Sequence, residues 1–168
     1  MSQNPTFKQK FLILAIFFCL SCGYHFVGES EIVFPNNAQK IALIQVINPT
    51  QYDYLPKEVK NFLNEEMVRQ SRARLVARDK ADLFLSVVLS QVEVGVKVTQ
   101  ENDSTGKYLA KVALFLVFST PQGKEIKRTL PVSYTQTYEK SSEQKDALIK
   151  ASQEALRLAL RQLKSYEF

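Results

Sequence analysis

Three residues able to bind a metal ion or take part in redox chemistry lie close together near the start of the chain: Cys19, Cys22 and His25. They are the only two cysteines and the only histidine among 168 residues. A C-x-x-C spacing with a histidine nearby is typical of metal and thiol–disulfide sites, but both thiols must then stay in the folded protein. The segment that precedes them decides whether they do.

That segment has the layout of an export signal. Lys8 and Lys10 precede ten residues without a polar side chain, 11–20. A helix of that length measures about 15 Å, roughly half the hydrocarbon core of a bilayer, so it is too short for a stable membrane span. We therefore predict a signal peptide at residues 1–21, which is absent from the mature protein.

The junction that follows, Leu20-Ser21-Cys22, resembles a bacterial lipobox, in which a diacylglyceryl group alkylates the cysteine thiol. Cys19 stands where a lipobox usually has leucine. Each acyl methylene buried in a membrane contributes about 0.8 kcal/mol, so several chains on Cys22 would form a lasting lipid anchor. Gly23, rather than aspartate, follows the cysteine, as in lipoproteins sent to the outer membrane. No thiol then remains for a disulfide or a metal, and His25 lacks partner ligands.

Composition and charge argue against several other function classes. From residue 22 onward, 20 basic residues face 17 acidic ones, a balance too mild to suggest nucleic-acid binding. The mature chain has neither a glycine-rich phosphate loop nor a nucleophile beside a base. The aspartates occur in predicted loops and at element ends. We expect no catalytic site, no metal site and no cofactor.

The hydrophobic pattern predicts one α+β domain at residues 39–168, joined to the anchor by a lipidated tether at 22–38. Strands are expected at 41–47, 81–98, 108–118 and 125–138, with a further short strand around 74–77. Helices are expected from Pro56 over about fifteen residues and from Ser141 onward. The predicted fold is a two-layer sandwich of two helices on a mixed, mostly antiparallel four-stranded sheet, in the order β-α-β-β-β-α.

Three local features sharpen this prediction. In 81–98 the apolar positions change from odd to even, which predicts a β-bulge near Ser90 and Gln91. Pro131 marks an edge or a bulge in the last strand. Ser141 and Gln144 have the spacing of a helix capping box.

The central strands carry more apolar surface than two helices can cover. Residues 108–118 are apolar on both faces apart from Lys111, whereas a two-layer sandwich covers only one face. Connecting segments of the chain, a partner protein or the acyl chains of a lipid could cover the second face.

These features together resemble the LPS-assembly lipoproteins, the LptE family. Cys22-Gly23-Tyr24-His25 matches a C-G-[YW]-H start, the first strand ends in N-x-T, and Ala81-Asp82 opens the long strand. The resemblance implies an outer-membrane lipoprotein, held on the periplasmic side, that plugs and helps to assemble the barrel LptD. It also implies that the protein assists lipopolysaccharide transport to the cell surface.

The family's proposed contacts to lipopolysaccharide phosphates are basic side chains near the end of the sheet. By position, the nearest counterparts here are Lys97, Lys107 and Lys140; the alternative for each is a solvated surface lysine without a ligand. The hairpin tip between the first two is acidic at Glu101 and Asp103.

A different class stays open as an alternative. A lipoprotein activator of a periplasmic cell-wall synthase, or a subunit of a secretion pore, can also carry a sandwich with an opening like Ala81-Asp82.

Overall fold

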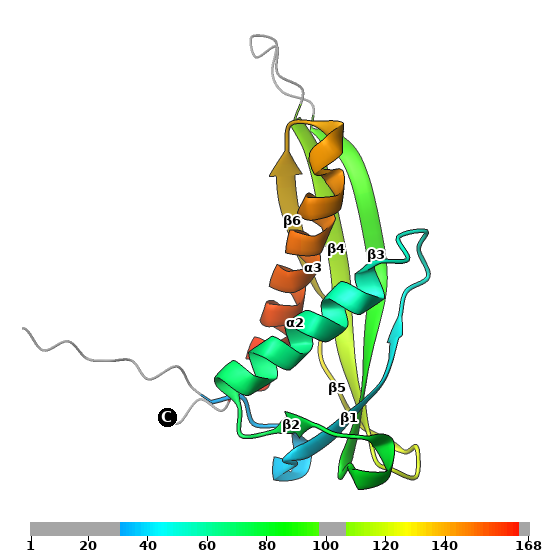
Figure 1. Ribbon diagram of the computed structural model, residues 1–168, viewed down its shortest axis with the longest axis vertical. Coiled ribbons are helices and arrows are strands. Elements are labelled where there is room, and N and C mark those ends of the chain that lie inside the picture. Colours follow the sequence, from blue (N-terminus) through cyan, green and yellow to red (C-terminus); the bar gives the residue numbers. More distant parts are fainter. Residues whose placement is uncertain (1–30, 98–106, 165–168) are drawn as a thin grey trace, which may run out of the picture.

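The computed structural model describes residues 31–97 and 107–164, and in these ranges two helices lie on one face of a six-stranded sheet (Figure 1). The strands are β1 (Lys40–Ile47), β2 (Arg74–Leu75), β3 (Leu83–Lys97), β4 (Lys107–Ser119), β5 (Glu125–Arg128) and β6 (Val132–Tyr138). The helices are α2 (Leu55–Gln70) and α3 (Gln144–Arg161), with the short 3₁₀ helices η1 (Pro35–Asn37), η2 (Arg78–Lys80) and η3 (Ser141–Glu143). The predicted α+β class and the two predicted helices are confirmed.

The prediction of a four-stranded, mostly antiparallel sheet is wrong. The strand order is β2-β1-β3-β4-β5, with β6 also paired to β4, and the sheet is mixed. β1 pairs in parallel with β2 and β3, whereas the pairs of β4 with β3, β5 and β6 are antiparallel. Because α2 follows β1 as a crossover helix, the chain re-enters the sheet in the direction of β1.

The predicted bulge in β3 is confirmed. Leu89 is paired with Leu114, and Gln91 with Ala113, the next residue along β4, so Ser90 is the extra residue. The shift keeps the leucines before the bulge and the valines after it on the same face of the sheet. The change of parity in the sequence therefore marks a single apolar face.

The last predicted strand, 125–138, is interrupted and forms β5 and β6 on the same edge of β4. Pro131 lacks an N–H and cannot continue the ladder. In the gap, the N–H of Thr129 donates to the carbonyl of Leu116 at 3.0 Å. The N–H of Leu116 in turn donates to Oγ1 of Thr129 at 2.9 Å, so the buried threonine replaces a missing backbone acceptor.

The side chain of Gln162, just after α3, hydrogen-bonds to the backbone of Leu130 in the same gap between β5 and β6. Nε2 of Gln162 donates to the carbonyl of Leu130 at 3.1 Å, and the N–H of Leu130 donates to Oε1 of Gln162 at 2.9 Å. One amide thus satisfies both backbone groups of a residue that has left the sheet.

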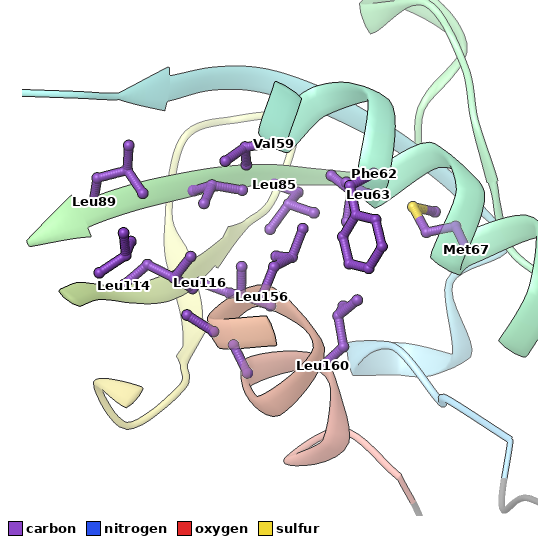
Figure 2. Packing of buried hydrophobic residues seen from close by; sticks show 14 of the residues in the cluster. Val59, Phe62, Leu63, Met67, Leu85, Leu89, Leu114, Leu116, Leu156 and Leu160 are labelled. Atoms are coloured by element: carbon purple, nitrogen blue, oxygen red, sulfur yellow. The ribbon is translucent and has the colours of Figure 1, made fainter. Parts of the chain in front are cut away.

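The hydrophobic core lies between the helices and the sheet (Figure 2). Its leucine-rich centre includes Val59, Phe62, Leu63 and Met67 of α2, Leu156 and Leu160 of α3, and Leu85, Leu89, Leu114 and Leu116 of the central strands. α3 adds a stripe of buried alanines at every fourth position, Ala147, Ala151, Ala155 and Ala159. Each fully buried leucine contributes about 1.5–3 kcal/mol, and the small alanines allow the helix backbone to lie near the strands.

Residues 31–38, expected at the end of the tether, pack against the domain. Ile32 and Phe34 are each 3% exposed. The N–H of Ile32 donates to the carbonyl of Gln70 at 2.9 Å. The ring of Phe34 meets that of Phe118 edge to face, with centroids 6.0 Å apart. This described part of the expected tether is therefore ordered on the core.

Candidate functional site

The three lysines singled out in the sequence come together at one end of the sheet, at the top of Figure 1. Lys97 and Lys107 are cross-strand partners at the end of β3 and the start of β4. Tyr108, next along β4, is paired with Tyr138, the last residue of β6, and Lys140 follows two positions later. Lys107 is half-buried and Lys140 is exposed. We call these three lysines the lysine end of the sheet.

A pair of tyrosines on neighbouring strands lies beside the lysine end. The rings of Tyr108 and Tyr138 are stacked, with centroids 5.3 Å apart and planes 20° from parallel. Burial, and then the nearby Tyr52 and Tyr108, raise the pKa of Tyr138 above 10.0. Its phenol is therefore neutral at physiological pH and adds no negative charge beside the lysines. Sequence reasoning missed this pair because the contact depends on the register of β6.

The connection from β6 to α3 is held by Glu143. Its Oε2 accepts from the N–H of Glu139 at 3.1 Å and of Lys140 at 3.4 Å. The predicted capping box assigned this role to Gln144, whose amide instead donates to the hydroxyl of Tyr52 at 3.4 Å. The short helix η3 comes before α3 and shifts the cap by one residue.

The face of the sheet turned away from α2 and α3, here called the open face, carries the apolar surplus that the sequence predicts. On β4 the even positions from Ala110 to Phe118 face the helices and are buried, while Phe115 and Val117 point to the open face and are half-buried. Phe84 and Val88 of β3 lie on the same face.

Two arginines of the chain lie over rings of the open face. The guanidinium of Arg78, from η2, is 5.3 Å from the ring centroid of Phe84. That of Arg128, from β5, is 5.1 Å from the ring centroid of Phe115. Connecting and edge segments thus cover part of the surplus, one of the alternatives left open by the sequence. Arg128 is also paired with Glu125, with Nη2 and Oε2 2.9 Å apart, so a carboxylate partly balances its charge above the ring.

Nearer the lysine end the open face becomes polar. Lys111 and Glu93 face each other across β4 and β3, with Nζ and Oε2 4.0 Å apart. A shallow pocket of about 400 Å³ is lined by Glu93, Val94, Gly95, Leu109, Lys111 and Thr135. Gly95 leaves the space of a side chain open there, because a Cβ at this position would meet no atom within 4 Å.

No candidate for a metal-binding cluster or a membrane-spanning helix occurs among the described residues. Among residues 31–97 and 107–164, no group of three or more His, Cys, Asp or Glu side chains could hold a metal ion. Neither described helix is long and apolar enough to cross a membrane. Cys19, Cys22 and His25 lie outside the described residues, as do Glu101 and Asp103 of the hairpin tip.

Solved structures with the same two-layer α+β fold include a bacterial lipoprotein. The chain is similar to the uncharacterised lipoprotein B of Nitrosomonas europaea, with a TM-score of 0.55 and 11% identity over 76% of this chain and 83% of that one. It is also similar to a putative neuraminyllactose-binding hemagglutinin homolog of Helicobacter pylori, with a TM-score of 0.51 and 16% identity over 84% and 90%. At these identities the likeness is one of fold. No family model matches the sequence, and no curated protein is similar to it.

Proposed function

We propose that the chain is an outer-membrane lipoprotein that plugs and helps to assemble the lipopolysaccharide-translocon barrel LptD and assists lipopolysaccharide transport to the cell surface. The observation that carries the proposal is the convergence of three lysines at one end of the sandwich: Lys97 from β3, Lys107 from β4 and Lys140 from the connection after β6. The lipobox-like junction and the C-G-Y-H start at Cys22 support the lipoprotein part of the proposal. The proposal assigns no catalytic step and no cofactor to the chain.

The lysine end has the chemistry to bind phosphate groups. Ammonium groups are compact charges that attract phosphate from any direction, and attraction at a protein surface is screened within about 8 Å at physiological salt. Several lysines that lie within this screening distance of one phosphorylated headgroup all attract it, so their contributions to binding add up. The half-buried Lys107 is less screened by solvent than the exposed Lys140, so we assign it the leading contact.

The lysine end lies at the opposite end of the sheet from the start of β1, which follows the described part of the tether, residues 31–38. Ile41, at the start of β1, is paired with Leu83, the first residue of β3, whereas Lys97 is its last. Fourteen residue steps along β3 correspond to about 46 Å. The stretch from Cys22 to Glu31 adds at most about 30 Å. An anchored domain could therefore hold its lysines well away from the membrane that carries the acyl chains.

The open face suits a barrel interior. The lumen of outer-membrane barrels is polar. On the open face Arg78 and Arg128 lie over the phenylalanine rings, and β6 adds exposed Ser133, Thr135 and Thr137. Such a surface favours contact with a polar protein wall over contact with acyl chains.

Co-purification from detergent-solubilised outer membranes tests the proposal. We expect the chain to be recovered with a large barrel protein, and its depletion to reduce lipopolysaccharide at the cell surface. Recovery without a barrel would contradict the proposal. A cell-shape or secretion defect with normal surface lipopolysaccharide would favour the cell-wall synthase activator or the secretion-pore subunit instead.

Mass spectrometry of the mature N-terminus tests the anchor separately. We expect a first residue Cys22 that carries acyl chains, and release of a Cys22→Ser variant from the membrane fraction. A free thiol at residue 22, or a mature chain that retains Cys19, would rule out this anchor.

A further inference from the structure

The outer edge of β1 is paired over only a small part of its length. β2 pairs with Lys40 and Ile41. Beyond them, residues 42–47 have β3 on one side and, in the described part of the chain, no strand on the other. Such an edge leaves backbone N–H and C=O groups available to a further strand.

The side chains of this edge do little to block pairing. Residues 42–47 contain no charge and no proline. Leu43, Ile44 and Val46 are half-buried, and Ile47 is 41% exposed. Proteins usually protect long edges with charges, prolines or bulges. Here the one such device within 42–47 is the bulge at Ile44, between Leu43 and Gln45 in the register with β3. The edge available to a partner is therefore short, about four residues.

The first turns of α2 make this edge one wall of a groove. The groove has a volume of about 400 Å³ and is lined by Leu43, Ile44, Gln45, Val46, Pro56, Lys57 and Lys60. Its floor is mainly aliphatic. Both lysines are exposed on its rim, and no carboxylate is among the lining residues.

We propose that this groove binds an extended acidic segment of a partner protein, which adds a strand to β1. Backbone hydrogen bonds to the edge would supply affinity, as in other cases of β-strand addition. Alternate side chains of the added strand point to opposite faces. Acidic ones on the side of α2 would meet Lys57 and Lys60, and apolar ones on the opposite side would lie beside the exposed Ile47. A second copy of the chain is disfavoured, because it would bring these lysines against their own counterparts. This surface is separate from the lysine end and does not depend on lipopolysaccharide binding.

The experiment uses the full chain in detergent and three fluorescein-labelled hexapeptides. The first alternates valine and glutamate, the second alternates valine and lysine, and the third is the first peptide with methylated backbone nitrogens. Binding is followed by fluorescence anisotropy, and hydrogen exchange with mass spectrometry locates the protected amides. We expect the valine–glutamate peptide alone to bind and to slow exchange within residues 42–47.

Charge reversal at the rim supplies the second test. Lys57→Glu with Lys60→Glu should weaken binding of the acidic peptide about three- to tenfold, the scale of two exposed ion pairs. The matched control is Lys124→Glu with Lys150→Glu, which changes the charge equally at exposed positions outside the groove. The control should bind like the unchanged chain.

Several results would overturn the proposal. These are no binding of the acidic peptide, equal binding of the N-methylated peptide, protection outside residues 42–47, or an equal loss in the control variant. Self-association of the chain that itself protects 42–47 would assign the groove to a second copy instead.

Discussion

The carboxylate of Glu66 in α2 lies 3.1 Å from the guanidinium of Arg157 in α3 and joins the two helices above the sheet. Glu66 is only 3% exposed and also accepts from Arg69 at 2.8 Å. The guanidinium of Arg157 lies over the ring of Phe62, 5.2 Å from its centroid. Burial acts to lower the pKa of Arg157, but its hydrogen bond with Glu66 and the nearby carboxylates of Glu154 and Glu66 outweigh burial and raise it. The pair therefore fixes the orientation of one helix on the other.

Removal of Glu66 should destabilise the domain. Glu66→Ala leaves the arginine charges without their shared partner, and we expect a loss of about 2 kcal/mol in the free energy of unfolding by urea. Glu66→Gln, which keeps the shape and some hydrogen bonding, should lose less. A double-mutant cycle with Arg157→Ala should give a coupling of about 1 kcal/mol. Additive losses would mean that the two side chains act independently.

The interrupted edge strand gives a second prediction. Thr129→Val retains the shape of the side chain but leaves the buried N–H of Leu116 without its acceptor, which should cost about 1–3 kcal/mol in urea unfolding. The matched variant Thr129→Ser keeps the hydroxyl and should cost only about 0.8 kcal/mol for the lost methyl. If the valine variant is the more stable of the two, the hydrogen bond makes no net contribution to the free energy of unfolding.

Tyr138 predicts how stability depends on alkaline pH. Its pKa is raised in the folded protein above 10.0, first by burial and then by Tyr52 and Tyr108. The folded state therefore holds this proton more firmly than the unfolded state. The stability that this difference in pKa contributes is fully present below pH 10 and is lost as the pH rises through the pKa of the folded state. Urea midpoints between about pH 9 and 12 should fall less steeply for Tyr138→Phe than for the unchanged chain. Equal slopes of the urea midpoint against pH in the two proteins would mean that ionisation of Tyr138 does not contribute to the loss of stability.

Charge reversal at the lysine end tests the lipopolysaccharide contacts. Lys107→Glu with Lys140→Glu should weaken binding of labelled lipopolysaccharide in a pull-down about three- to tenfold, with association to the barrel retained. The control is again Lys124→Glu with Lys150→Glu. The effect should shrink as salt is added, because these charges are screened. Binding that is unchanged by the lysine-end variant would remove these residues from the site.

Sequence periodicity predicted those parts of the fold that depend on neighbours along the chain. The bulge near Ser90 follows from a change of parity within one strand, and both helices follow from their apolar stripes. The short strand expected around 74–77 is confirmed as β2, but the four-stranded prediction omits it, because two residues, Arg74 and Leu75, show no alternation that would place them beside β1. The burial of Glu66 and its ion pair with Arg157 could not be predicted either, because Arg157 lies far along the chain in the other helix. In the sequence, Glu66 is only a polar residue that interrupts the apolar stripe of its helix.

For the candidate site, the limit is the register between strands. A hairpin over 99–107 already implies that Lys97 and Lys107 are near each other. The position of Lys140 beside these two lysines depends on the register with which β6 pairs with β4. The same holds for Arg128, which covers Phe115 only because it is paired with Val117 on the neighbouring strand. The sequence could predict that something covers the open face but could not identify these arginines.

The contact between the two ends of the described chain bears on the order in which the protein folds. Ile32 forms a β-bridge with Lys164, and the N–H of Val33 donates to the carbonyl of Leu163 at 3.2 Å. Closing so long a loop is costly in entropy, so such contacts form late. Ile32 and Val33 can complete these contacts only once Leu163 and Lys164, which follow α3, are in place. The segment at 32–33 therefore docks on the core as a last step of folding rather than a first one.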